Sequence, residues 1–196
     1  MVYDLSSLKK MIDKHQCFPA GEWEYFESIL EIRSMKKGEY LLKQGKVCSK
    51  IYFILKGGVR MYYKGPCGKE VSFNFLFENN FVTAFTSFAH QVVSKENITL
   101  LEDSILVTIE YNNFISLLRR HSSWEIIFGK LMAYHLAEMY VKEEMLLLDK
   151  PEQRYIKVFE TRREIFGRVE QRHIASYLGV TPETLSRIKR KVLKNC

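Results

Sequence analysis

The sequence predicts an α+β protein in which an N-terminal antiparallel β-roll is joined by a long helix to a C-terminal all-α helix-turn-helix. Three observations predict this order. Short apolar segments separated by turn signals occupy residues 32–109, a proline-free helical pattern covers residues 124–148, and two short amphipathic segments flank Gly179. Short strands at close spacing are typical of small antiparallel barrels and rolls, and the later change of period indicates a second, helical core.

The first thirty residues predict two short helices, Leu5–Lys14 and Glu22–Leu30, with a break at residues 19–21. Strands are expected at Tyr40–Leu42, Ile51–Leu55, Val59–Tyr63, Val71–Phe77, Ile98–Leu101 and Ile105–Ile109. In the fourth strand Val71, Phe73, Phe75 and Phe77 alternate with smaller or polar residues and Leu76. This period of two predicts one continuous aromatic face.

The long helix is expected from about Trp124 to Leu148, with Ser122 and Ser123 available as caps. Its apolar residues form two stripes, and a helix with two apolar stripes needs two partners. One partner is the roll. The other is the same helix of a second subunit, and the predicted interface residues are Phe128, Met132, His135, Met139 and Leu146. A single broad core-facing surface within a monomer is the alternative.

A break at Asp149-Lys150 ends this helix, and Pro151 suits the first position of the next one. We therefore expect a hinge here. The predicted domains are a sensor β-roll with flanking helices at residues 1–121, a dimerisation helix at 122–149 and a helix-turn-helix domain at 150–196.

The positive charge is confined to the end of the chain. Residues 1–149 contain 18 basic and 18 acidic residues, whereas residues 150–196 contain 12 basic and 5 acidic residues, which accounts for the net charge of +7. A basic segment that also carries periodic apolar residues suits a folded domain that binds a polyanion. No apolar run is long enough for a membrane span and no secretory pattern is present, so a cytoplasmic protein is expected.

The four cysteines are far apart and the five histidines are isolated, so no zinc, iron–sulfur or cupin-type metal site is indicated. No nucleophile elbow or phosphate-binding glycine loop is present either. We expect no cofactor and no enzymatic activity. A cupin-like β-roll enzyme and a module whose basic helix binds an acidic protein remain the alternatives.

The strongest local pattern lies between Gln171 and Val192. Ile174, Ala175 and Leu178 form an apolar face on one short helix, and Gly179 follows where a tight turn requires positive φ. Thr181 is placed to cap a second helix that begins at Pro182, and Leu185, Ile188 and Val192 are its buried face. This arrangement predicts a helix-turn-helix.

The exposed face of the second helix carries Glu183, Arg187, Arg190 and Lys194 at helical spacing. Arginine binds guanine edges bidentately and glutamate accepts from cytosine, so this face suits base recognition. The predicted DNA-binding residues are Thr181, Pro182, Glu183, Thr184, Arg187, Lys189, Arg190, Lys191 and Lys194. A helical hairpin with a solvated basic face is the alternative.

Residues Val180–Ile188 resemble the recognition helix of the Crp/Fnr family of bacterial transcription regulators. Tyr52–Arg60 is similar to that family's β-roll hairpin, and Gly68–Glu70 to the turn that follows it. The resemblance covers nearly the whole chain. It implies a cyclic-nucleotide-binding-like roll of the double-stranded β-helix type and a homodimer that binds a palindromic promoter site in double-stranded DNA. RNA polymerase is a further implied partner.

Two departures from the family pattern concern DNA binding. Glu183 and Arg187 match the base-reading pair, but Pro182 stands where a base-contacting arginine is frequent, so one base preference should be lost or changed. The recognition helix is followed by Cys196 rather than a β-wing, so fewer backbone contacts are expected.

The resemblance also locates an effector pocket. Thr83-Ala84 and Ser94-Lys95 align with the pairs that hold the ribose and the cyclic phosphate in cAMP-responsive relatives. Neither the carboxylate nor the bidentate arginine is retained, which implies no tight cAMP binding by the usual mode. The effector pocket residues are predicted to be Phe73, Phe75, Thr83, Ala84, Phe85, Ser94, Lys95, Met139 and Tyr140. An unidentified small-molecule effector and a roll filled by its own aromatic side chains are both open.

Overall fold

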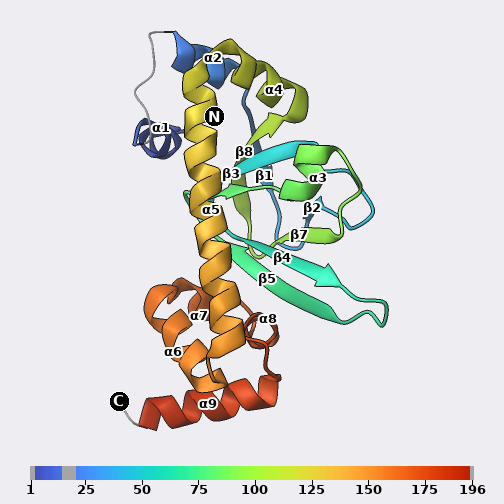
Figure 1. The fold of residues 1–196 in the computed structure, drawn as a ribbon, viewed down its shortest axis with the longest axis vertical. Helices are drawn as coiled ribbons and strands as arrows, with labels where there is room; N and C mark the ends of the chain where they lie inside the picture. Colours follow the sequence, from blue (N-terminus) through green and yellow to red (C-terminus); the bar gives the residue numbers. More distant parts are fainter. Residues whose placement is uncertain (1–2, 15–20, 195–196) are drawn as a thin grey trace.

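The computed structural model describes residues 3–14 and 21–194, the last two as backbone only. A β-roll lies beside the upper part of one long helix, and four shorter helices surround the lower end of that helix (Figure 1). The elements before and within the roll are α1 (Ser6–Asp13), α2 (Glu22–Ser28), β1 (Glu31–Met35), β2 (Tyr40–Leu42), β3 (Lys50–Lys56), β4 (Val59–Lys64), β5 (Glu70–Leu76), β6 (Phe81–Val82), α3 (Phe85–His90), β7 (Glu96–Leu100) and β8 (Ser104–Glu110). The elements after it are α4 (Tyr111–Arg120), α5 (Ser122–Leu148), α6 (Pro151–Thr161), α7 (Glu164–Arg168), α8 (Gln171–Tyr177) and α9 (Pro182–Lys194).

The roll consists of two four-stranded antiparallel sheets, in the orders β1-β8-β3-β6 and β2-β7-β4-β5. The sheets and the helices that pack on them enclose a core that includes Phe53, Ile54, Ile98 and Leu106, each at most 1% exposed. The predicted fold class is therefore confirmed, because short strands with one apolar face have closed on each other and on a helix.

The prediction of a continuous aromatic face over residues 71–77 is wrong at one position, Phe73. Met61 pairs with Asn74, whereas the next residue, Tyr62, pairs with Ser72, so Phe73 is an extra residue in β5. Such a bulge turns the strand locally and interrupts the alternation of its side chains. Phe73 packs against the roll, stacked on Tyr63 at 4.7 Å between ring centroids, while Phe75 packs among the C-terminal helices.

Helix α5 is 27 residues long, and its ends belong to different cores. Trp124, Ile127 and Leu131 are buried in the roll, whereas Met145 is buried among the C-terminal helices. The predicted serine cap is replaced by His121, whose Nδ1 accepts a hydrogen bond of 3.2 Å from the backbone N–H of Ser123. No helix in the described part of the chain is both long and apolar enough to cross a membrane.

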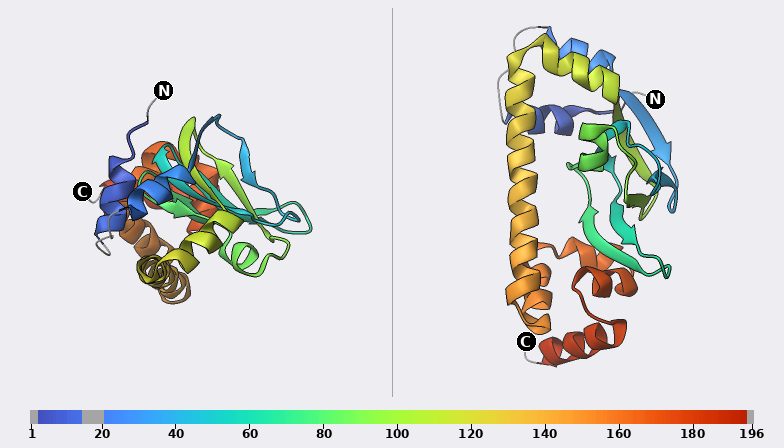
Figure 2. Two further views of the ribbon diagram at one scale, coloured as in Figure 1. Left: turned by 90° about the horizontal axis from the view of Figure 1, so that it is seen from above. Right: turned by 45° about the vertical axis from the view of Figure 1, so that its right-hand side comes forward.

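The second core combines helices with one edge of the roll. Tyr155, Val158 and Ile165 of α6 and α7 meet Phe75 of β5 and Phe77, just beyond it. Figure 2 shows these helices below the roll and beside α5. The sensor, helix and DNA-binding divisions predicted from the sequence remain an interpretation, since one hydrophobic cluster contains residues of all three.

We expect the stability of this shared core to depend most strongly on Phe75. Phe75→Ala should lower the free energy of unfolding by about 3–5 kcal/mol, because a fully buried ring is replaced by a cavity. Urea denaturation measures the change. Phe85→Ala is the matched control, because Phe85 is 55% exposed and its loss should cost no more than about 0.5 kcal/mol. Equal effects of the two substitutions would contradict the shared core.

Candidate nucleic-acid interface

The turn between α8 and α9 is built as the sequence predicts. Gly179 has a φ of +68°, and a Cβ there would lie 3.0 Å from Nη1 of Arg154. Arg154 in turn donates from Nη1 to the carbonyl of Leu178 at 2.9 Å, which closes the turn against α6. Ile174 and Ala175 of α8 are both buried. The turn is therefore fixed by a residue without a side chain and by an arginine that occupies the space beside it.

Helix α9 begins with a side-chain cap. The hydroxyl of Thr181 accepts a hydrogen bond of 3.2 Å from the backbone N–H of Thr184, and Pro182 is the first helical residue. Leu185 and Ile188 are buried at 1% and 5% exposure, so this side of α9 packs on the helices above it. Because side chains on a helix recur every 3.6 residues, the side chains on the opposite side of α9 point away from this core.

The outward side of α9 carries the two residues predicted to contact bases. Glu183 and Arg187 are exposed, and α9 lies at the end of the molecule farthest from the roll (Figures 1 and 2). Arg187 donates from Nη2 to the hydroxyl of Thr184 at 3.0 Å, and its other donors have no hydrogen-bond partner among the described residues. The backbone N–H of Glu183, with the Thr181 hydroxyl, lowers the pKa of the Glu183 carboxyl, so this group is ionised at neutral pH.

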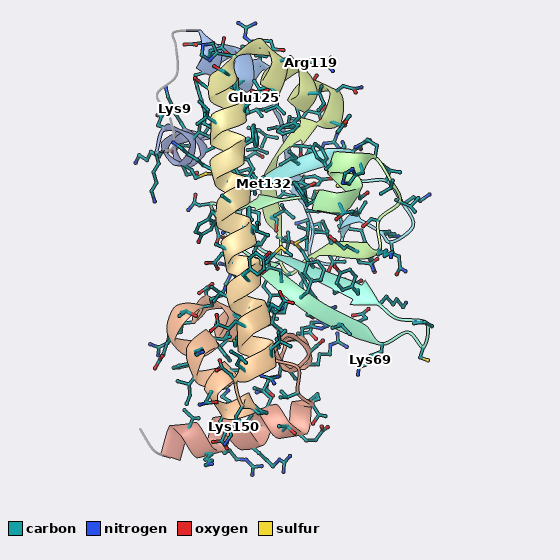
Figure 3. The ribbon with its side chains drawn as sticks, viewed as in Figure 1. Lys9, Lys69, Arg119, Glu125, Met132 and Lys150 are labelled. Carbon is teal, nitrogen blue, oxygen red and sulfur yellow. The ribbon has the colours of Figure 1, made fainter. Side chains whose placement is uncertain are left out.

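The remaining predicted contact residues divide into two groups. Lys189 and Arg190 are exposed, and Arg190 makes only a long contact of 3.5 Å from Nε to the Ser186 carbonyl. Lys191 is turned toward α6, where its Nζ lies 2.8 Å from Oε1 of Glu152. The side chain of Lys194 lies outside the described residues. Nitrogen-tipped side chains project from the outer edge of α9 in Figure 3, away from the rest of the molecule.

The position of α9 depends on how the C-terminal helices are attached to β5. β5 is an edge strand, and its unpaired backbone groups bind side chains from helices. The N–H of Ser72 donates to Oγ of Ser176 at 3.0 Å, and that hydroxyl donates to the carbonyl of Glu70 at 3.2 Å. Lys142 of α5 donates to the carbonyl of Phe73, and Arg162 donates to that of Phe75. We call this set of contacts the β5 attachment.

An ionic cluster strengthens the β5 attachment at one end. Arg168 of α7 donates to Glu78 at 2.7 Å and to Glu102 at 2.9 Å, and its guanidinium lies 4.3 Å from the ring centroid of Phe77. Hydrogen bonding from Arg168 lowers the pKa of Glu78 to about 2, and the backbone N–H of Gly57 assists. The cluster therefore joins two loops of the roll to the helix that precedes the helix-turn-helix.

Arg162, Arg168 and Ser176 were not among the residues predicted from the sequence. Their partners in the roll are 66 to 111 positions away in the chain, so no local pattern marks them. The excess of arginine in residues 150–196 is the available signal, and by itself it predicts only a polyanion as partner. Part of that charge instead binds the roll.

The predicted effector residues do not gather in one pocket. Thr83 donates to the carbonyl of Lys50 at 3.1 Å, Ala84 is fully buried, and Oγ of Ser94 binds the backbone of Glu96. Lys95 is exposed. The groups aligned with the ribose and phosphate contacts are therefore engaged within the roll or turned to solvent.

The other predicted pocket residues are dispersed. Phe75 belongs to the second core, and Phe85, Met139 and Tyr140 are 55%, 68% and 63% exposed. The space between the roll and α5 contains a chain of ring contacts instead. Phe81 and Phe114 both approach Phe128, at 6.3 and 4.5 Å between ring centroids. These contacts favour the alternative of a roll filled by its own side chains.

The predicted dimer residues also occupy different surroundings. Phe128 is buried in the roll and Leu146 packs on the second core, so these two side chains are occupied within the chain. Met132, labelled in Figure 3, and His135 are half-buried, and Met139 is exposed. The large apolar residues of α5 that are exposed are Ile126, Tyr134, Leu136, Met139, Tyr140, Val141, Leu147 and Leu148. Met139 is the one predicted interface residue among these eight, so the exposed stripe that they form differs from the predicted one.

The described residues contain no group of three or more His, Cys, Asp or Glu side chains suited to a metal ion. The two described cysteines, Cys48 and Cys67, are free thiols.

Comparison with known proteins identifies the roll and the overall fold. Residues 32–121 match the cyclic nucleotide-binding domain family. No curated protein matches the sequence significantly. A protein from Eubacterium rectale assigned to the Crp/Fnr family of transcriptional regulators aligns with a TM-score of 0.72 at 16% identity, over 91% of this chain and 85% of the other.

Two further solved structures share the fold. The c-di-GMP responsive global regulator CLP of Xanthomonas campestris aligns with a TM-score of 0.73 at 16% identity, covering 90% of this chain and 93% of that one. The catabolite activator protein of Thermus thermophilus aligns with a TM-score of 0.56 at 18% identity, covering 91% and 85%. The chain therefore has a cyclic nucleotide-binding domain within a fold shared with Crp/Fnr regulators.

Arg168→Met should weaken the β5 attachment in a pH-dependent way. At pH 7 we expect a loss of about 2 kcal/mol in the free energy of unfolding, because two partly buried carboxylates lose their partner. The pKa of Glu78 is about 2 in the folded chain against an ordinary 4.5, so its contribution is complete above pH 4.5 and lost as the pH falls toward 2. The difference between wild type and variant should shrink over that window.

Chemical denaturation at pH 7 and pH 3 measures this difference. Arg33→Met is the control, because Arg33 and Glu31 form an exposed pair that should contribute less than about 1 kcal/mol at either pH. A pH-independent loss in Arg168→Met would show that the ionic cluster does not stabilise the attachment.

Proposed function

We propose that this chain, which has the fold of the Crp/Fnr transcriptional regulators and a cyclic nucleotide-binding domain at residues 32–121, is a dimeric regulator that binds specific DNA sequences. The observation that carries the proposal is the outward face of α9. It presents Glu183 and Arg187 at the end of the molecule, within the segment that holds the whole net positive charge. The fold alone is compatible with other roles, whereas this face has the chemistry for base recognition.

The two residues of this face have distinct roles in the proposal. Arg187 presents a fork of donors that matches O6 and N7 of guanine, and Glu183 is an ionised acceptor for the amino group of cytosine. Thr181, Lys189 and Arg190 flank them at the start and on the sides of α9, where phosphate contacts set the register. Pro182 has no donor for a base, so the half-site should be specified by fewer side chains than in relatives that carry arginine there.

The second subunit is proposed to cover the exposed apolar stripe of α5. Met139, Leu147 and Leu148 are 68%, 75% and 75% exposed, which is unusual for large apolar residues on one helix. Pairing of two such helices buries both stripes at once, as in a coiled coil. A two-fold axis along α5 would present two α9 helices to successive major grooves, about 34 Å apart on the duplex.

The roll is proposed to act without cAMP bound in the usual mode. Neither Thr83-Ala84 nor Ser94-Lys95 supplies the carboxylate and the guanidinium that such binding needs. The β5 attachment connects the roll with α9. In this proposal an effector that acts on the roll changes DNA binding by changing the contacts between β5 and the C-terminal helices.

Arg187→Ala should abolish the preference for one base pair in each half-site. A duplex selected from a randomised pool by the wild type should bind the variant about 5- to 150-fold more weakly, with non-specific binding nearly unchanged. Mobility shift with salt titration measures both quantities. Arg119→Ala is the control, because Arg119 lies at the opposite end of the molecule (Figure 3). The affinity of this variant for the selected duplex should equal that of the wild type. Failure of the wild type to enrich any sequence at low salt would refute the proposal.

Met139→Glu should convert the dimer into a monomer. The change places a charge on the exposed stripe of α5 without touching either core, so the monomer should remain folded. The monomer should bind the palindromic duplex about 100-fold more weakly, because the second half-site no longer benefits from tethering.

Light scattering after size-exclusion chromatography measures the mass of each variant. Ile156→Glu is the matched control, since Ile156 is also an exposed apolar residue but lies on α6. A wild-type chain that is monomeric at all concentrations, or a dimer unaffected by Met139→Glu, would contradict the proposed interface.

A further inference from the structure

The side chain of Lys142 enters the boundary between the roll and the C-terminal helices without meeting a carboxylate. It projects from α5 and is half-buried, and its Nζ donates to the carbonyl of Phe73 at the bulge of β5. The same Nζ lies 3.8 Å from the ring centroid of Tyr177 on α8. One amine of α5 therefore contacts both β5 and α8, which lie beside the lower half of α5 in Figure 1.

The nearest charged group has the same sign as the ammonium of Lys142. Arg162, directly after α6, donates from Nη1 to the hydroxyl of Tyr177 at 3.2 Å, so two cations share one aromatic side chain. The carboxylate that accompanies Arg162 is Glu164, at 3.8 Å. Lys142 itself forms no ion pair with a carboxylate of the described residues.

The other titratable groups on the elements around Lys142 supply no negative charge to it. Glu70 of β5 is paired with Arg60 at 2.6 Å. On α8, burial and then neighbouring arginines lower the pKa of His173 to about 4, so this imidazole is neutral at pH 7. On α5 itself, Glu138 and Glu143 are exposed.

The ammonium of Lys142 therefore loses hydration without gaining a counter-charge. Loss of hydration disfavours the charged form of a lysine, and the nearby guanidinium of Arg162 disfavours it further. Both effects lower the pKa of Lys142 to about 7, against an ordinary 10.5. The neutral amine still has hydrogens to donate to the carbonyl of Phe73, so this contact survives the loss of the proton.

We propose that Lys142 makes the β5 attachment sensitive to pH, because its neutral amine stabilises the contact between roll and C-terminal helices and its protonation weakens that contact. When the attachment opens, Lys142 meets water and its pKa returns toward 10.5, so the open form binds the proton more tightly. The attachment is therefore weakest below pH 7 and gains stability as the pH rises from 7 toward 10.5. The orientation of α9 relative to the roll then depends on pH in the neutral range.

NMR titration of the free protein tests the first step. In protein labelled with ¹³C-lysine, the Cε resonance that is missing from Lys142→Arg identifies Lys142, and its chemical shift is followed as the pH is raised. We expect a midpoint near pH 7. A midpoint above about pH 9.5 would overturn the proposal, because the amine would then stay charged throughout the neutral range.

Hydrogen–deuterium exchange tests the consequence for the β5 attachment. The backbone N–H of Ser72 donates to Ser176 and not to a neighbouring strand, so it exchanges when the C-terminal helices leave β5. Between pH 6 and pH 8 its exchange rate in the wild type, divided by the rate in Lys142→Met, should fall about tenfold. The division removes the intrinsic effect of pH on exchange, which the two proteins share.

Two further variants make the exchange experiment specific. Lys142→Arg keeps its charge at every pH, so the rate in the wild type divided by the rate in this variant should also fall about tenfold. Lys46→Met is the control, because Lys46 is an exposed lysine of the roll, and the corresponding ratio should be equal at both pH values. Constant ratios for both Lys142 variants would overturn the proposal. Neither measurement contains DNA, so a failure of the proposed regulatory function would leave this outcome unaffected.

Discussion

The free edge of β5 is the constraint on which the rest of the molecule depends. An edge strand presents backbone N–H and carbonyl groups that must find partners once the edge is covered. Here Ser176 of α8, Lys142 of α5 and Arg162, directly after α6, supply those partners. The C-terminal helices are therefore held in one orientation by directional contacts to a strand, and this orientation places α9 across the end of the molecule (Figure 1).

The bulge at Phe73 makes β5 suitable for this role. One extra residue lets the strand present Phe73 to the roll and Phe75 to the C-terminal helices, so the same strand contributes to both hydrophobic clusters. A movement in the roll that shifts β5 must then shift the helices as well, because close-packed interiors transmit displacement. In the proposed regulator this strand, rather than the hinge at Asp149-Lys150 alone, connects the roll with DNA recognition.

The arginines of the C-terminal segment perform two tasks that composition does not separate. Arg187 and Arg190 face solvent on α9, whereas Arg162 and Arg168 bind groups of the roll. Charge at this boundary thus stabilises the attachment of the two parts.

The sequence by itself determined the features that depend on near neighbours in the chain. The positions of six of the eight strands that the structure describes, the start of α6 at Pro151, the positive φ of Gly179 and the Thr181 cap follow from spacing and local backbone preference, whereas β1 and β6 were not predicted. Only the tertiary structure decided which stripe of α5 remains exposed, where Phe128 and Leu146 pack, and which arginines bind the roll. Those choices depend on contacts between residues as many as 111 positions apart, and side-chain types within a short window carry no information about such partners.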